Sequence, residues 1–113
     1  MRKYILILGV LFVMVSCKSD KIEPANPNCP DEVSFSQTIE PLITSNCGSC
    51  HGTGGTPPAL TNHTEISSSA DNIIARIQLD PTNSQLMPFG GPKLADSTIQ
   101  QFKCWVDQGK LNN

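Results

Sequence analysis

Residues 47–51 read Cys47-Gly48-Ser49-Cys50-His51, and the interpretation of the chain starts from this stretch. The pattern C-x-x-C-H is typical of covalent attachment of a c-type haem. Two thiols three positions apart on one helical turn are placed to add to the two vinyl groups of one porphyrin. The histidine that follows then offers its imidazole to the iron. The pattern predicts that Cys47 and Cys50 bind one haem c covalently and that His51 is an iron ligand.

Three other interpretations of the cysteine pair stay open at this point. A thioredoxin-like redox pair would follow a buried strand in a βαβ unit, and no such strand pattern precedes Cys47. A structural zinc site needs a fourth ligand, so it would have to recruit His63 or Cys104. The third interpretation is a local disulfide between Cys47 and Cys50 beside an incidental histidine.

The first sixteen residues are typical of an export signal. Arg2 and Lys3 precede an uncharged run that extends to Ser16 and is too short for an ordinary membrane-spanning helix. Residues 13–17, Val-Met-Val-Ser-Cys, resemble the end of a bacterial lipoprotein signal. This resemblance implies that residues 1–16 are a cleaved signal peptide and that Cys17 is lipidated. We therefore expect an exported, membrane-anchored lipoprotein on the periplasmic side or at the cell surface; an ordinary cleaved signal is the alternative.

Two cysteines remain once lipid and haem are assigned. The chain has five cysteines, and with Cys17, Cys47 and Cys50 taken, Cys29 and Cys104 are left. An even remainder in an oxidising compartment favours a disulfide between them. A pair of free buried thiols is the alternative.

Size and charge are those of one small acidic domain. Removal of residues 1–16 leaves 97 residues with a net charge near −4. No basic patch is present, so nothing favours nucleic acid as a partner. Residues 17–30 are polar and contain three prolines, which predicts an extended tether behind the lipid. Residues 31–113 then form the domain.

The first expected helix covers residues 35–46 and leads into the cysteine motif. Ser34 and Gln37 have the spacing of a capping box. Pro41 interrupts the pattern because proline removes a helical hydrogen bond, so the alternative is a helix that begins near Glu40 after a short turn. The apolar residues that fall on one face are Phe35, Ile39, Leu42 and Ile43.

Further helices are expected downstream, and no strand of ordinary length is expected anywhere. Residues 62–69 and 70–79 predict two short helices. The last helix is expected over residues 96–108, with Trp105 as a core anchor and Gly109 as its stop.

The sixth iron ligand has two candidates. Met87 is the only methionine outside the signal, in a loop rich in proline and glycine that could hold its sulfur over the iron. His63 is the rival ligand. Methionine ligation raises the reduction potential and favours simple electron transfer, whereas a vacant position would favour peroxide or gas chemistry.

These residues together resemble a class I cytochrome c domain, and more narrowly a lipoprotein-type monohaem c-type cytochrome, from about Val33 to Asn113. The resemblance rests on the C-x-x-C-H motif, on the Met-Pro…Gly-Gly-Pro-Lys-Leu stretch at 87–94, and on the Trp-Val-x-x-Gly helix end at 105–109. It implies an all-α fold of three to four short helices around one covalently bound haem. It also implies that the Pro58 carbonyl accepts the ring N–H of His51 and that Leu60 packs on the porphyrin.

The expected function is that of a lipid-anchored monohaem c-type cytochrome carrying one electron at a time. Redox proteins and the membrane would be its partners, with no small-molecule substrate. No general acid or base pair is found, so we do not expect an enzyme. The alternative is a haem peroxidase or a haem sensor module, if Met87 is not a stable ligand.

Overall fold

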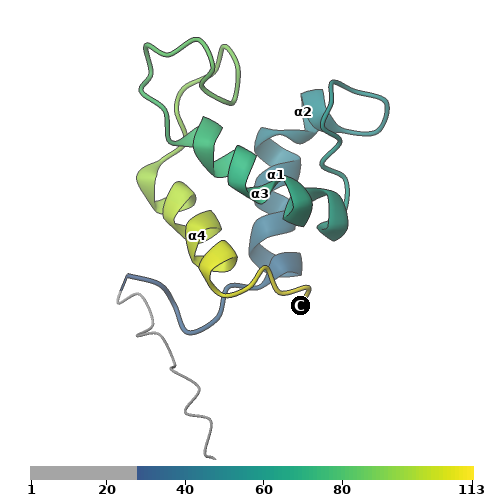
Figure 1. Cartoon of the computed structure of the whole chain (residues 1–113), viewed down its shortest axis with the longest axis vertical. Helices are drawn as coiled ribbons and strands as arrows, with labels where there is room; N and C mark the ends of the chain where they lie inside the picture. Colours follow the sequence, from purple (N-terminus) through teal and green to yellow (C-terminus); the bar gives the residue numbers. More distant parts are fainter. Residues whose placement is uncertain (1–27) are drawn as a thin grey trace, which may run out of the picture.

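The computed structural model describes residues 28–113 and shows a small domain without strands over that range (Figure 1). Its helical segments are η1 (Phe35–Ile39), α1 (Glu40–Asn46), α2 (Gly48–His51), α3 (His63–Ile77) and α4 (Asp96–Asp107). The expectation of an all-α domain is confirmed for these residues. The predicted signal peptide at 1–16, the predicted lipidation site Cys17 and most of the predicted tether at 17–30 lie outside the described residues. None of the helices within 28–113 has the length and apolar character needed to cross a membrane.

The first helix shows how the chain accommodates Pro41. Its opening segment η1 is a wide π-helical turn, in which the Ile39 N–H donates to the Ser34 carbonyl at 3.3 Å. The Ser34 hydroxyl caps this turn by accepting the Gln37 N–H at 3.2 Å. Pro41 then occupies the first turn of α1, where a missing N–H costs no helical hydrogen bond. Helical structure thus extends over residues 35–46, as expected, and its α-helical part begins at Glu40, the alternative start.

A single long helix, α3, replaces the two short helices expected over residues 62–79, and that prediction is wrong. The polar serines at 67–69 weaken helix propensity, but they do not break a helix because the buried apolar face continues across them. The buried positions recur at helical spacing at Ile66, Ala70, Ile73 and Ile77.

The start of α3 is strongly capped. The Asn62 side chain accepts the Glu65 N–H at 3.0 Å, and the Glu65 carboxylate accepts the Thr61 N–H and hydroxyl, each at 2.8 Å. These bonds from Thr61 lower the pKa of Glu65. The caps hold the first turn of α3, and with it His63, in a defined position.

Helix α4 supplies the largest buried side chains. Trp105 is fully buried, as expected for a core anchor, and its indole N–H donates to the Leu111 carbonyl at 2.9 Å. The helix ends in a Schellman motif: the N–H groups of Lys110 and Gly109 bond the carbonyls of Trp105 and Val106 at 2.9 and 3.0 Å. Gly109 has φ of +93° there, which explains why glycine stops this helix.

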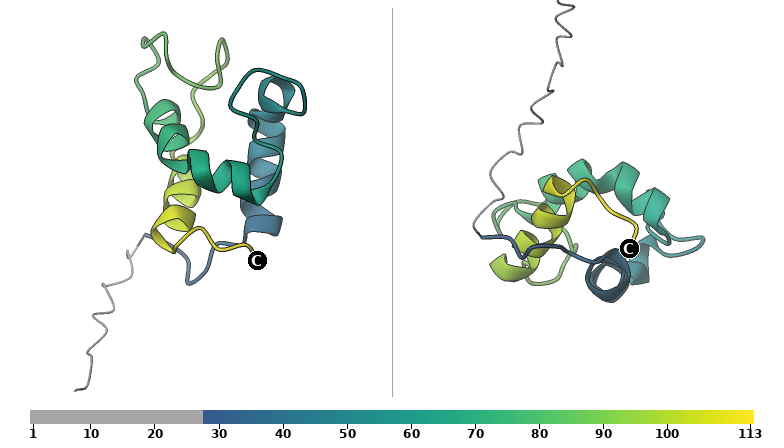
Figure 2. Two further views of the ribbon diagram at one scale, coloured as in Figure 1. Left: turned by 45° about the vertical axis from the view of Figure 1, so that its right-hand side comes forward. Right: turned by 90° about the horizontal axis from the view of Figure 1, so that it is seen from below.

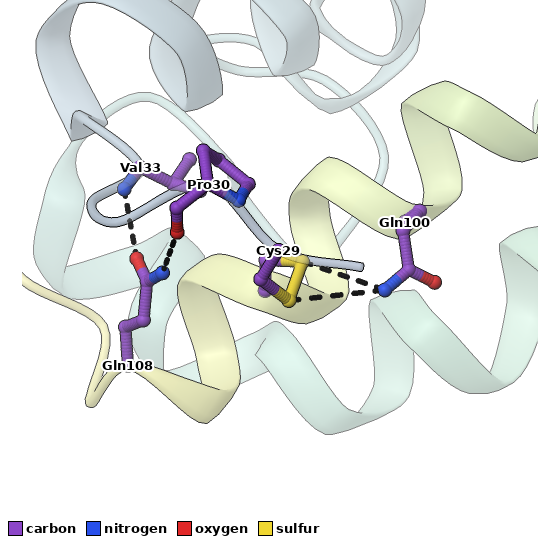
Figure 3. Close-up of a disulfide and its surroundings, with 6 residues drawn as sticks. Cys29, Pro30, Val33, Gln100 and Gln108 are labelled. Atoms are coloured by element: carbon purple, nitrogen blue, oxygen red, sulfur yellow. Dashed lines mark hydrogen bonds between the residues drawn. A yellow bond between two sulfur atoms is a disulfide. The ribbon is translucent and has the colours of Figure 1, made fainter. Parts of the chain in front are cut away.

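A disulfide and hydrogen bonds join the N-terminal segment of the domain to α4. Cys29 and Cys104 form a disulfide, and the Gln100 side chain lies against both sulfurs (Figure 3). Below it, the Gln108 side chain accepts the Val33 N–H at 2.7 Å and donates to the Pro30 carbonyl at 2.9 Å. The entry segment 29–33 is thus held along the length of α4.

The helices leave two loops at one end of the molecule. In Figures 1 and 2, α2 with the loop that follows it and the loop between α3 and α4 both rise to the same end, while the C-terminus lies at the other. The C-terminal segment packs under η1, where the Asn113 side chain and carbonyl accept the N–H groups of Phe35 and Ser36 at 2.8 Å each. These bonds join the C-terminal segment to the start of the first helical segment.

Candidate functional site

The cysteine motif forms a single turn of helix at the end of α1. Cys47 ends α1 and begins α2, and its carbonyl accepts the N–H groups of Cys50 and His51 at 3.2 and 2.8 Å. Both thiols are free, with Cys47 half-buried and Cys50 exposed. The turn therefore presents two unlinked sulfurs from one short segment, and the local disulfide between them is not formed in this structure.

The ionisation of Cys47 bears on the redox interpretation of the pair. Burial raises the pKa of the Cys47 thiol, and the neighbouring Cys50 adds a smaller contribution in the same direction. Reactive cysteines of redox C-x-x-C motifs have a lowered pKa, since the thiolate is the nucleophile. The described residues also contain no strand that could begin a βαβ unit. Both observations weigh against a thioredoxin-like role.

The imidazole of His51 is oriented by two backbone carbonyls. Its Nδ1 lies 2.9 Å from the Thr56 oxygen and 2.9 Å from the Pro58 oxygen. Carbonyl oxygens only accept hydrogen bonds, so Nδ1 must carry the proton that is shared between them. In the neutral ring the lone pair is then on Nε2, and no hydrogen bond within residues 28–113 engages that atom. The pairing of His51 with Pro58 is as the sequence suggested; the Thr56 partner was missed.

The loop after α2 folds back tightly to bring these carbonyls into place. The Thr56 N–H bonds the Cys50 carbonyl at 2.7 Å, and the Leu60 N–H bonds the His51 carbonyl at 2.8 Å. A Cβ on Gly52 would come within 2.6 Å of the Gly48 oxygen, and one on Gly55 would collide with the Cys50 oxygen. Glycine at these two positions allows the close backbone approach, a signal that sequence analysis left unused. Leu60 ends the loop as a buried residue.

Met87 lies in the loop between α3 and α4. Its side chain is half-buried against the core, and its N–H donates to the Arg76 carbonyl at 3.4 Å. The turn that follows is closed by the Gly91 N–H on the Pro88 carbonyl at 3.2 Å, with Gly90 at φ of +73°. The loop rises to the same end of the molecule as α2 (Figure 2). The loop that contains Met87 and the loop that follows His51 are therefore at the same end of the domain.

His63, the rival candidate for the sixth iron ligand, is engaged in contacts elsewhere in the domain. Its Nε2 donates to the Lys110 carbonyl at 2.8 Å. Its ring packs edge-on against Phe35 and Trp105, with centroid distances of 4.9 and 5.9 Å. In this arrangement His63 joins the first turn of α3 to the C-terminal segment. Arg76, in the last turn of α3, is exposed.

A four-ligand zinc site is not assembled among the described residues. Cys104 is in the disulfide, His63 is in the aromatic cluster, and no group of three or more His, Cys, Asp or Glu side chains is gathered within residues 28–113. The two residues that could have completed a zinc site with Cys47 and Cys50 are therefore engaged elsewhere.

The residues present fit a covalently held haem. Two free thiols lie on one turn, and the adjacent imidazole has its Nδ1 proton bonded and its Nε2 unpaired over the described residues. Apolar side chains from several segments also pack on the core while staying partly exposed: Leu42, Ile74, Met87 and Leu94. An apolar porphyrin would cover exposed surface of this kind. The haem iron would need one imidazole and one thioether as ligands, and His51 and Met87 are the candidates for them.

Comparisons with protein families, with curated proteins and with solved structures found no match for this chain.

Proposed function

We propose that this chain is a monohaem c-type cytochrome of class I type that carries single electrons between redox proteins. The observation that carries the proposal is the state of His51, whose ring is fixed by two carbonyls with Nε2 free, directly beside two unlinked thiols. When bound, the haem would supply a one-electron couple at its iron. Cys47 and Cys50 would hold it covalently, and His51 and Met87 would be the iron ligands.

The chain's own residues would keep this site rigid. The hydrogen bonds from Nδ1 of His51 to Thr56 and Pro58 prevent rotation of the imidazole. The bond from Met87 to the Arg76 carbonyl ties its loop to the end of α3. Ligands that do not move when the charge of the site changes make reorganisation small, which favours electron transfer over ligand exchange. No acid or base is required, so the protein is proposed as a carrier and not an enzyme.

The first prediction concerns the absorption spectrum of the protein produced in a host that attaches c-type haem. We expect haem that stays on the chain after denaturation, sharp low-spin bands after dithionite reduction, and a far-red sulfur-to-iron band in the ferric form. A ferric high-spin spectrum would instead support a peroxidase or a sensor. A chain without haem, or haem that is extracted from the denatured protein, would contradict the proposal.

We also propose that the protein is exported and anchored by lipid on Cys17, with the residues between Cys17 and Cys29 as the tether, since Cys29 and Pro30 are already bonded to α4. The second prediction is that the full-length protein partitions into the detergent phase of a Triton X-114 extraction, because acyl chains gain about 0.8 kcal/mol per buried methylene. A variant in which residues 1–17 are replaced by an ordinary cleaved signal should be recovered in the aqueous phase. Equal partitioning of the two proteins would contradict the lipid anchor.

A further inference from the structure

The loop that follows α2 is held in place by the cysteine motif and not by packing on the core (Figure 1). Residues 53–59 are exposed, and Leu60 is the first buried residue of the loop. Three backbone hydrogen bonds return the loop to α2 and its cap, with lengths of 3.0, 2.7 and 2.8 Å: Gly55 N–H to Gly52, Thr56 N–H to Cys50 and Leu60 N–H to His51. The positions of the loop carbonyls are therefore set by α2 itself.

The imidazole of His51 depends on this loop for its orientation. Its residue is only half-buried, and none of the aromatic contacts within residues 28–113 involves it. The carbonyl oxygens of Thr56 and Pro58 each lie 2.9 Å from its Nδ1, so one N–H is shared between two acceptors in a three-centre bond. A single acceptor would leave the ring a range of tilts, because hydrogen bonds tolerate angles well away from linear. Two acceptors narrow that range.

The glycine at position 55 places the second acceptor. A Cβ on Gly55 would collide with the Cys50 carbonyl oxygen. That same oxygen accepts the Thr56 N–H at 2.7 Å, so a side chain at position 55 would displace Thr56 directly. Pro58 is farther along the loop, next to the anchor that buried Leu60 provides. A substitution at position 55 should therefore move the Thr56 carbonyl and leave the Pro58 carbonyl in place.

We infer that Gly55 and Thr56 are positioning residues for the iron ligand: the tight turn adds the Thr56 carbonyl as a second acceptor for the Nδ1 proton of His51, and the shared bond makes Nε2 a more basic ligand. The inference rests on the proposed function. A ligating imidazole gains basicity when its other N–H is engaged by a partner. A more basic ligand stabilises ferric over ferrous iron, so the Thr56 carbonyl lowers the reduction potential. Its effect is opposite in sign to that of methionine ligation.

The direct test uses the unmodified, haem-loaded ferrous protein labelled with ¹⁵N and ¹³C, because NMR scalar couplings pass through hydrogen bonds. The Nδ1 of His51 should be coupled to the carbonyl carbons of both Thr56 and Pro58. Coupling to fewer than two carbonyls would overturn the inference and leave the electron carrier intact. Failure of the proposed function would show earlier, as absence of the c-type spectrum.

The consequence for the ligand is tested with Gly55→Ala. The ring Nδ1 proton of His51 should exchange with solvent about fivefold faster in the ferrous variant, the factor that corresponds to one ordinary hydrogen bond. The ferric–ferrous equilibrium should shift about threefold toward ferrous, which raises the potential by about 30 mV for one electron. A change of less than twofold in the exchange rate, or a fall in the potential, would overturn the inference.

Two other glycines provide matched controls. A Cβ on Gly48, within the motif, would meet its nearest atom at 3.9 Å, which is an ordinary contact. Gly54 has φ of +74° and open space around it, so Gly54→Ala strains the turn without pushing on the Cys50 carbonyl. Both alanine variants should keep the exchange rate within about twofold of the unmodified value, since neither removes a hydrogen bond. If Gly54→Ala reproduces the changes of Gly55→Ala, strain in the turn is their cause and the role assigned to Gly55 is wrong.

Discussion

Cys29→Ala should lower the free energy of unfolding by about 4.5 kcal/mol, which makes it the most destabilising single change that we expect in the domain. The disulfide to Cys104 closes a loop of 75 residues, and loop-closure entropy gives this value for a link of that length. Chemical denaturation of the ferrous protein, followed by far-UV circular dichroism, measures the effect. The haem remains covalently attached during unfolding under the proposed function, so both proteins refold from comparable states.

Gln100→Ala is the control for this prediction. It removes the side chain that lies 3.4 Å from the Cys104 sulfur and 3.8 Å from the Cys29 sulfur, but it keeps the covalent link (Figure 3). A lost hydrogen bond of this kind costs about 1 kcal/mol or less. If Cys29→Ala costs no more than Gln100→Ala, the disulfide does not stabilise the domain through chain entropy. Cys29 is chosen for replacement because Cys104 is fully buried, and its replacement would also leave a cavity.

The parts of the fold that could be predicted are those controlled by local chemistry. The cap at Ser34, the stop at Gly109 and the helix that contains Trp105 each depend on residues close together in the chain. The division of residues 62–79 into two helices was wrong, because the apolar spacing from Ile66 to Ile77 continues across the serines at 67–69. Burial of a continuous face outweighs the weak helix propensity of a few serines.

Contacts between distant segments were harder to predict. The position of Asn113 against Phe35 joins residues 78 apart, and no local pattern marks it. The engagement of His63 with the Lys110 carbonyl is of the same kind, at a separation of 47. Of the candidate site, the bond between His51 and Pro58 followed from a family resemblance, whereas the Thr56 carbonyl depends on how tightly the glycine loop turns.

Met87→Leu should turn the ferric protein high-spin, remove the far-red sulfur-to-iron band and lower the reduction potential by on the order of 0.1–0.3 V, within the range of about 0.8 V that axial ligands cover. Leucine matches methionine in volume, so the half-buried position stays filled and packing changes little. The loss of sulfur is thereby separated from the loss of contacts. Optical redox titration measures the reduction potential, and the ferric spectrum of the same sample shows the spin state and the far-red band.

The rival ligand is tested by His63→Gln, whose side-chain amide keeps a donor for the Lys110 carbonyl. We expect this variant to retain the low-spin spectrum and a potential close to that of the unmodified protein, because the His63 ring packs on Phe35 and Trp105 and is bonded to the C-terminal segment. The opposite pattern, with a high-spin His63→Gln and an unchanged Met87→Leu, would transfer the ligand role to His63. It would also require α3 to release its first turn from the C-terminal segment, since Nε2 cannot bind iron and donate to a carbonyl at the same time. The capped start of α3 opposes such a release, and this is the physical reason for proposing Met87, and not His63, as the sixth ligand.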